Sequence, residues 1–407
     1  MGSYLLVFAI TAIVTFAVTP LVRALSSRLG WIDRPSDRKV HPKPTPTAGG
    51  IGIWIGLSAG LIASRFVPFL RDLFDTGSDL DAVALAGTAI VVLGVIDDTR
   101  GVSALGKLAG QVLIAGVLVL IGVQFIWFYF PGQGLLSLSP DIAVPLTIIW
   151  VVLMVNAVNL IDGLDGLAAG IVAIAAIAFF TYIAWPEGNP AGNVEASAAA
   201  LLAVIAAGAA IGFLPWNFYP AKIFMGDSGA LLLGLVLAVA TISGAVRNLN
   251  GPPDETSGAL AAIVIPITLP LLVLSIALLD VVLAIIRRMR RGIGIGHADK
   301  EHIHHRLMDI GHTHRQAVLL MYLWSALISG SALVVAFIDG TLLVGAIVGA
   351  AVIVAAVLPK LIRDRSPRGS DRPVDGNGAG TPVSAVAARA DRTPPRPARR
   401  DRAPGAS

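Results

Sequence analysis

Long apolar segments recur along the whole of this sequence. A helix needs about 20 mostly apolar residues to cross the hydrocarbon core of a bilayer. Because that core offers no water to the backbone, a crossing segment must satisfy its own hydrogen bonds, which a helix does. We therefore predict an all-α polytopic membrane protein with about eleven transmembrane helices. The predicted spans are residues 3–24, 48–66, 81–96, 105–124, 142–159, 166–185, 196–213, 228–246, 258–286, 317–337 and 341–360.

The composition supports this class and excludes several kinds of chemistry. Of the 407 residues, 55% are hydrophobic and 14% are charged, whereas soluble domains carry roughly 25% charged residues. The sequence contains no cysteine, which excludes disulfides, thiolate metal ligands and a cysteine nucleophile. The net charge of +4 reflects a basic membrane face and a basic tail, so we expect a lipid bilayer and no nucleic acid as partner.

The basic residues predict the orientation of the chain in the membrane. With eleven spans, one face receives only Arg65, Arg71 and Arg247 of the 30 lysines and arginines. The face rich in lysine and arginine is normally cytoplasmic. We therefore expect an outside N-terminus, a cytoplasmic C-terminus, and a multi-pass protein of the cell inner or plasma membrane with its active site on the cytoplasmic face.

The chain divides by composition into two regions. Residues 1–360 hold all the apolar spans and form the predicted transmembrane catalytic domain. Residues 361–407 are rich in Arg, Pro, Gly, Asp and Ala, and such a segment cannot bury a core, so we expect a disordered basic cytoplasmic tail. The aromatic-rich segment 125–138 is interpreted as an interfacial belt or a shallow re-entrant segment.

Four polar residues interrupt the apolar pattern at every third position, namely Asn156, Asn159, Asp162 and Asp165. Polar groups in a membrane segment are costly and usually functional. In an unbroken helix of about 100° per residue, Asp165 would lie nearly opposite Asn156. Nearby glycines predict that the helix breaks there and that a turn brings the carboxylates back to one site. A helix-capping turn is the alternative, but it explains only two of the four.

A second polar motif, Asp97-Asp98, is followed by Lys107. Adjacent carboxylates at a helix end repel each other unless a cation lies between them. Mg²⁺ prefers oxygen ligands and often binds through one or two carboxylates plus substrate phosphates. A solvated surface turn is the alternative for this pair.

A third motif, Phe224-Met-Gly-Asp227-Ser-Gly, precedes the apolar span 228–246. Its aspartate has the position of a helix N-cap. The same position also places backbone N–H groups and a carboxylate together, which suits a phosphate and a metal ion. Phe224 is a candidate to stack on a planar base.

Two basic segments lie on the same predicted face. Residues 31–50 include Lys43, which either contacts anionic groups or anchors the loop at the cytoplasmic side. Six of the seven histidines lie between 297 and 314. Because Lys300 and Arg306 accompany them, we favour anion binding over a zinc site or incidental surface histidines. Carboxylates and cations on one face are what phosphoryl transfer requires.

In combination, these motifs resemble those of the polyprenyl-phosphate N-acetylhexosamine-1-phosphate transferases. The match extends from about residue 31 to 315 and includes Asp97-Asp98, residues 156–166, residues 224–229 and His302-Ile-His304-His305-Arg306-Leu. The resemblance implies that a membrane polyprenyl phosphate attacks the β-phosphorus of a UDP-amino sugar. UMP then leaves, and a polyprenyl-diphospho-sugar remains in the membrane.

The resemblance also implies roles for individual residues. Asp97, Asp98 and Asp227 would be catalytic and would serve Mg²⁺, with Mn²⁺ as an alternative ion; Asp227 is the foremost metal ligand, and Asp97 is a candidate to accept the lipid phosphate's proton. A covalent aspartyl-phosphate route is a second option. The implied substrate-binding residues are Lys43, Lys107, Asn156, Asn159, Asp162, Asp165, Phe224, His302, His304, His305 and Arg306.

Within the family, the histidine motif favours UDP-GlcNAc as donor, as in the bacterial UDP-GlcNAc:undecaprenyl- or decaprenyl-phosphate GlcNAc-1-phosphate transferases. The peptidoglycan branch, which acts on UDP-MurNAc-pentapeptide, typically has three consecutive histidines, and this chain does not. A secondary transporter and an aspartate-rich prenyltransferase are alternatives of other classes. The expected partners are UDP-GlcNAc and polyprenyl phosphate, and a homodimer stays open.

Overall fold

The computed structural model describes residues 1–35, 43–130, 134–184, 196–247, 267–268, 270–271 and 313–338. The predicted span 341–360, nearly all of 258–286, the histidine motif and the tail lie outside these residues. The helices described are α1 (Gly2–Leu29), α2 (Gly50–Arg65), α3 (Pro68–Arg71), α4 (Leu73–Thr76), α5 (Asp79–Arg100), α6 (Ala104–Ile121), α7 (Pro140–Ile161), α8 (Leu167–Ala184), α9 (Ala198–Asn217), α10 (Gly226–Arg247) and α13 (His314–Ile338).

The helical, membrane-spanning character of the chain is confirmed. Within the described residues, eight helices are long and apolar enough to cross a membrane, and α2 joined to α3 and α4 across a bend of 105° makes a ninth. The eight helices overlap spans predicted from the sequence, and α2 overlaps the predicted span 48–66, whereas α3 and α4 lie beyond it. The total of eleven and the sidedness of the termini stay predictions. Exposed leucines along α6, such as Leu113 and Leu120, suit a surface that faces lipid.

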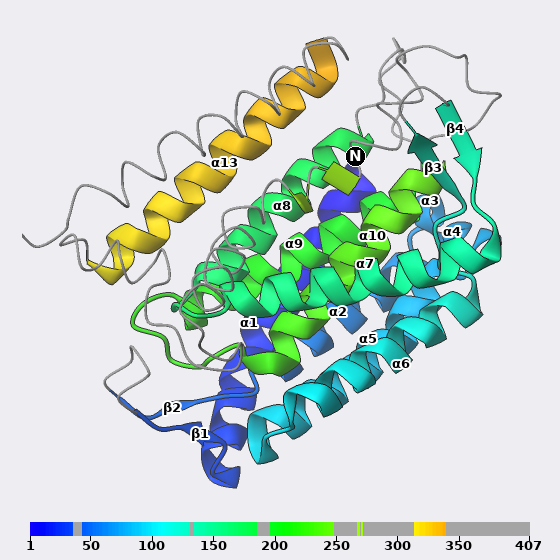
Figure 1. The fold of residues 1–407 in the computed structure, drawn as a ribbon. Coiled ribbons are helices and arrows are strands. Elements are labelled where there is room, and N and C mark those ends of the chain that lie inside the picture. Colours follow the sequence, from blue (N-terminus) through cyan, green and yellow to red (C-terminus); the bar gives the residue numbers. More distant parts are fainter. Residues whose placement is uncertain are drawn as a thin grey trace, which may run out of the picture. The chain divides into compact units, whose positions relative to one another are not determined.

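Two small antiparallel ribbons add to the expected all-α fold. Strands β1 (Ile32–Asp33) and β2 (Thr45–Pro46) pair near one end of the helices, and β3 (Trp127–Phe130) and β4 (Gly134–Ser137) pair near the opposite end (Figure 1). The second ribbon is the secondary structure of the segment predicted as an interfacial belt or re-entrant segment, whose place relative to the membrane stays a prediction. Its sequence explains the strands, because a run of four aromatic residues favours a strand and a Pro-Gly pair follows it as a turn signal.

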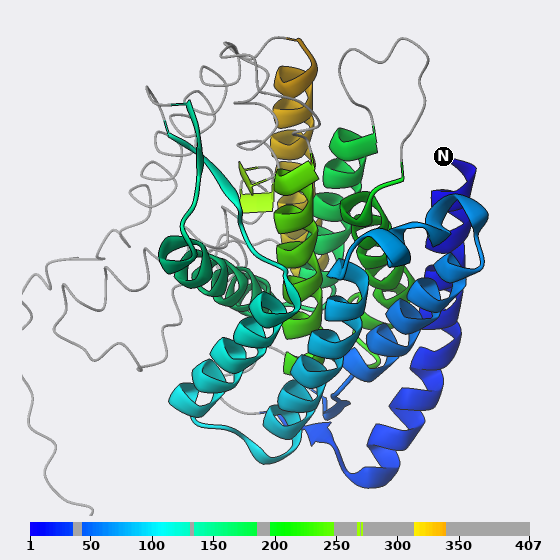
Figure 2. The same cartoon turned by 90° about the vertical axis from the view of Figure 1, so that its right-hand side faces the viewer.

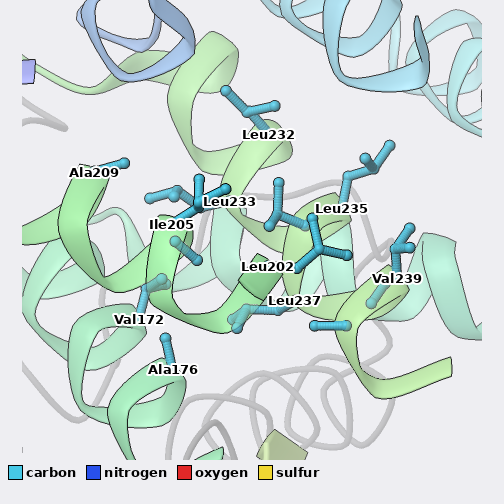
Figure 3. Packing of buried hydrophobic residues seen from close by; sticks show 14 of the residues in the cluster. Val172, Ala176, Leu202, Ile205, Ala209, Leu232, Leu233, Leu235, Leu237 and Val239 are labelled. Carbon is cyan, nitrogen blue, oxygen red and sulfur yellow. The ribbon is translucent and has the colours of Figure 1, made fainter. Parts of the chain in front are cut away.

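Helix α10 forms the centre of the described bundle. It packs against α2, α5, α7 and α9. The part of α10 that is long enough to cross a membrane is completely buried, in agreement with its place among these helices (Figure 2). Its leucines contact α8 and α9 in a continuous apolar core that includes Val172, Leu202 and Ile205 (Figure 3). The apolar core therefore fixes α10, the helix whose first turn carries Asp227.

Glycines allow the start of α10 to approach its neighbours closely. A Cβ at Gly94 of α5, or at Gly50 of α2, would overlap backbone atoms of Ser228 or Gly229. The backbone also joins these segments, because Gly50 N donates to Met225 O over 2.9 Å. The absence of side chains at these two glycines therefore sets how deeply the first turn of α10 lies in the bundle.

We predict that Gly94→Ala destabilises the protein, because the new methyl group has no space beside Ser228. Overpacking of this kind costs about 1–3 kcal/mol. Thermal unfolding of the purified protein in detergent measures the effect. Gly116→Ala in α6 is the matched control, since a Cβ there meets nothing within 4 Å and Ala favours a helix. Equal unfolding temperatures for the two variants would contradict the account.

Candidate active site

Four helices have ends in the part of the bundle that carries β1 and β2 (Figure 1), and polar side chains from these four helices contact one another. Helix α5 ends there, α6 and α10 begin there, and α7 ends there. We call Asp97, Lys107, Asn159 and Asp227 the charged cluster. The structure thus brings together residues that are separated by up to 130 positions in the sequence.

Lys107 lies between two carboxylates. Its Nζ is 3.1 Å from Oδ2 of Asp97, and it also forms an ion pair with Oδ2 of Asp227. The side chains of Lys107, Asp97 and Asp227 are only 17%, 15% and 25% exposed. Charges shielded this far from water are costly unless they are paired, so the ammonium group of Lys107 stabilises both carboxylates and is stabilised by each of them.

The remaining oxygens of the cluster are also bound. Asn159 Nδ2 donates to Oδ1 of Asp227 over 2.8 Å, and the backbone N of Val102 donates to Oδ1 of Asp97 over 2.7 Å. Each carboxylate is therefore held on one side by a fixed neutral donor and shares a cation on the other. An arrangement of this kind presents a defined position for positive charge.

Asp98, next to Asp97, has different surroundings. Its Oδ1 accepts from the backbone N of Asp227 over 2.8 Å. Its Oδ2 accepts from Ser228, over 2.8 Å from Oγ and 3.2 Å from the backbone N. Asp98 therefore contacts the first turn of α10, whereas Asp97 contacts Lys107.

The predicted helix break is confirmed. Helix α7 ends at Ile161 and α8 begins at Leu167, and Gly166 has a φ of 81°, which favours glycine. The turn returns Asp162 toward the carboxylates of the charged cluster. Burial raises the pKa of Asp162 to about 8, and the negative charges of neighbouring aspartates, Asp227 first, add to the rise.

Asp165 binds a different part of the chain. Its Oδ2 accepts from the backbone N of Ala221 over 2.9 Å. Buried Asn217 supports the same contact, because Oδ1 accepts from Gly166 N over 3.0 Å and Nδ2 donates to Ile223 O over 3.1 Å. These bonds attach the α7–α8 turn to the segment that leads into α10.

Asn156 lies one helical turn before Asn159 and pairs with Gln111 of α6. Its Nδ2 donates to Oε1 of Gln111 over 2.6 Å and to Val152 O over 2.7 Å. Gln111 is one turn beyond Lys107, so this amide pair continues the polar contact between α6 and α7 below the charged cluster. Asn156 thus contacts α6 and makes no hydrogen bond to the described aspartates.

Phe224 and Lys43 lie on the segments that enclose the start of α10. The backbone N of Phe224 donates to Pro46 O over 2.8 Å, and Gly49 N donates to Phe224 O over 3.0 Å. Lys43 is exposed and lies just before β2. The predicted residues His302, His304, His305 and Arg306 lie outside the described residues, so their roles stay predictions.

Three residues of this region were absent from the sequence predictions, namely Gln111, Asn217 and Ser228. Gln111 and Lys107 are the two polar side chains of the otherwise apolar α6, and Asn217 is the last residue of α9, before the segment that leads into α10. Polar residues at such places indicate function or buried hydrogen bonding. Ser228 belongs to the predicted motif, but only the fold shows that it contacts Asp98.

The structure permits a test of the predicted metal site. In the described part of the chain, no group of three or more histidine or acidic side chains is arranged to hold a metal ion by itself. Asp97 and Asp227 do converge on one cation, the ammonium of Lys107. Two carboxylates that leave other positions to water and phosphate fit Mg²⁺.

Comparison with known proteins agrees with this site. The family described as glycosyl transferase family 4 matches residues 81–245. The chain is 40% identical to the decaprenyl-phosphate N-acetylglucosaminephosphotransferase of Mycolicibacterium smegmatis, over 81% of each chain. It is 36% identical to the probable undecaprenyl-phosphate N-acetylglucosaminyl 1-phosphate transferase of Bacillus subtilis, over 81% of this chain and 84% of the relative.

A more distant relative belongs to the alternative branch. Identity to the phospho-N-acetylmuramoyl-pentapeptide-transferase of Halalkalibacterium halodurans is 31%, over 59% of this chain and 73% of the relative.

The fold and the charged cluster define a multi-pass membrane protein with a polar site at its helix ends. The chain belongs to glycosyl transferase family 4, among the polyprenyl-phosphate N-acetylglucosamine-1-phosphate transferases.

The raised pKa of Asp162 predicts how stability depends on pH. An unfolded aspartate titrates near 3.9, whereas Asp162 in the folded protein titrates at about 8. Between these values the folded state binds a proton that the unfolded state has lost, so stability falls as pH rises. Asp162→Asn removes this loss. Its unfolding temperature should exceed that of the wild type by several degrees at pH 8, with little difference at pH 4. An equal difference at both pH values would contradict this assignment.

Proposed function

We propose that this protein transfers GlcNAc-1-phosphate from UDP-GlcNAc to a membrane polyprenyl phosphate. An oxygen of the lipid phosphate forms a bond to the β-phosphorus of the nucleotide sugar. The bond between that phosphorus and the bridging oxygen breaks, and UMP leaves with the bridging oxygen. Polyprenyl-diphospho-GlcNAc stays in the membrane, as the first lipid-linked step of a cell-envelope polysaccharide.

The observation that carries this proposal is the charged cluster at the ends of apolar helices. A reaction between a lipid phosphate and a nucleotide diphosphate brings several negative charges together. The main task of the protein is therefore positioning and charge neutralisation. The cluster provides an ammonium group and two carboxylates at one point, close enough to the apolar spans for the phosphate of a lipid to reach it.

Asp227 and Asp97 would hold Mg²⁺ together with substrate phosphates, and the ion would supply charge neutralisation at the diphosphate. The ammonium group of Lys107 occupies the position between the carboxylates in this structure. With the ion bound there, Lys107 would instead bind phosphate oxygens. Asn159 keeps Asp227 oriented through its hydrogen bond to Oδ1. Mn²⁺ is the alternative ion.

The need for a general base is small in this reaction. A phosphate monoester has a second pKa near 6, so most of the lipid phosphate is already ionised at pH 7. Asp97 faces Lys107 and is the better placed of the adjacent aspartates to accept a residual proton. Its main contribution would be to hold positive charge beside the attacking phosphate.

Other residues would enclose the donor. Asp162, Asp165 and the segment that they hold would form one wall of the nucleotide pocket, and Phe224 would stack on uracil. The histidines 302, 304 and 305 with Arg306 and Lys43 would contact the diphosphate or the sugar. We place this site on the cytoplasmic face of the plasma or inner membrane, because nearly all the lysines and arginines fall on that predicted face.

The choice of UDP-GlcNAc rests on the relatives. GlcNAc-phosphotransferases resemble this chain over about four fifths of its length at 36–40% identity. The pentapeptide transferase resembles it over 59% at 31% identity. These relatives therefore support the GlcNAc reaction over the peptidoglycan reaction, and membership in a transferase family leaves a secondary transporter without support.

An assay with the purified full chain tests the proposal. The protein is incubated with polyprenyl phosphate, Mg²⁺ and either UDP-GlcNAc or UDP-MurNAc-pentapeptide, and the released nucleotide is identified. We expect UMP from UDP-GlcNAc alone. Release of UDP would show an ordinary glycosyl transfer, and UMP from the pentapeptide donor alone would show the peptidoglycan reaction.

Asp227→Asn makes the same assay specific for the site. Loss of one preorganised charged group typically lowers turnover by about 10²–10³-fold, and we expect at least this loss because Asp227 contacts both Lys107 and Asn159. Asp141→Asn, at the exposed start of α7, is the matched control and should stay active. Near-normal activity of Asp227→Asn would remove Asp227 from the reaction.

A further inference from the structure

The two adjacent aspartates of α5 point to different partners. Neighbouring residues on a helix are separated by about 100° around its axis, so the two side chains leave α5 in different directions. Asp97 faces Lys107. Asp98 instead uses both of its oxygens for hydrogen bonds from the first residues of α10.

The first N–H groups of a helix have no partner within the helix. In α10 two of them, from Asp227 and Ser228, donate to Asp98, and the Ser228 hydroxyl adds a third bond. Asp98 thus caps α10 from another helix. Gly226 has a φ of 68°, and a Cβ there would meet the Asp98 carboxylate, so the chain enters the helix directly against this cap.

We propose that Asp98 is a positioning residue, which holds the backbone of Asp227 so that its side chain lies between Lys107 and Asn159. In this role it binds neither the metal ion nor the substrate. Both oxygens of Asp98 accept hydrogen bonds from α10, whereas Asp97 faces Lys107. This inference departs from the catalytic and metal-binding role that the resemblance implies for Asp98.

The consequence for catalysis runs through Asp227. The side chain of Asp227 pairs with Lys107 and accepts from Asn159, and its backbone N is bound to Asp98. Loss of the cap would release the first turn of α10 while the rest of the helix stays held by the apolar core. Asp227 would then sample positions away from Lys107, and the fraction of molecules with a complete cluster would fall.

The conservative variant Asp98→Asn separates this role from a direct one. An asparagine keeps one oxygen to accept from Asp227 N, and its amide can donate to the Ser228 hydroxyl oxygen, whereas the backbone N–H of Ser228 loses its acceptor. The bond that holds the Asp227 backbone therefore survives. A metal ligand or a base needs the negative charge, which asparagine lacks. Asp98→Ala removes the cap and the charge together.

The activity test builds on the proposed function and uses the UMP-release assay on the full chain. Because a neutral hydrogen bond replaces a charged one at modest cost, we expect Asp98→Asn to keep kcat within about tenfold of the wild type. The Mg²⁺ concentration for half-maximal activity and the KM for UDP-GlcNAc should not change. Asp98→Ala should lose kcat far more strongly. Asp97→Asn is the matched control and should show no such rescue.

Hydrogen exchange of the peptide that contains residues 225–229 gives a readout that does not depend on the reaction. The cap predicts slow exchange of the Asp227 and Ser228 amides in the wild type, slow exchange of the Asp227 amide in Asp98→Asn, and faster exchange of both amides in Asp98→Ala. If Asp98→Ala does not fold, the exchange and activity of Asp98→Asn decide alone. Exchange of the Asp227 amide equal to wild type, together with lost activity in Asp98→Asn, would overturn the proposal. If the wild type releases no UMP from either donor, the proposed function fails, and the exchange of the variants still decides the positioning role.

Discussion

The ammonium group of Lys107 lies between the carboxylates of Asp97 and Asp227, where three helices of a membrane protein meet. Charged groups this close to the bilayer and this little exposed are costly by themselves. The two carboxylates are tolerated because they share the ammonium group, and the ammonium group is tolerated because both carboxylates neutralise it. Removal of one partner from a buried ion pair leaves an uncompensated charge, which is strongly destabilising. The same ion pairs make the site suitable for phosphate chemistry. A substrate that brings phosphate groups and a metal ion can exchange partners with the ammonium group and the carboxylates.

Two layers of the structure keep this balance in place. The apolar core fixes α10 among α2, α5, α7 and α9, and small residues let its first turn approach α2 and α5. Polar contacts then set the details at the helix end. Asp98 binds the first turn of α10. Asn217 and Asp165 bind the α7–α8 turn to the segment that precedes α10. The position of Asp227 thus depends on residues that need not touch any substrate.

Much of this could be predicted from the sequence. Hydrophobic runs of sufficient length predicted nine spans that the structure describes as helices, because membrane helices must satisfy their own backbone. The glycines near Asp162 predicted the break between α7 and α8. The aromatic ribbon after α6 was not predicted, since its residues also suit a membrane interface. Spacing alone could not show that Asp97 and Asp98 face different partners, because that depends on where α10 enters the bundle.

The partners of long-range polar contacts were likewise beyond sequence reasoning. Gln111 and Asn156 are 45 positions apart, and no local pattern in the chain links them. The charged cluster depends on the electrostatic coupling between Lys107 and Asp227, and a double-mutant cycle measures that coupling. Lys107→Gln, Asp227→Asn and the double variant are unfolded thermally in detergent. Residues in contact usually couple by about 0.5–3 kcal/mol, so the double variant should lose less stability than the sum of the two single losses. Strict additivity of the two losses would show that the ammonium and carboxylate groups do not stabilise each other, and would contradict the account.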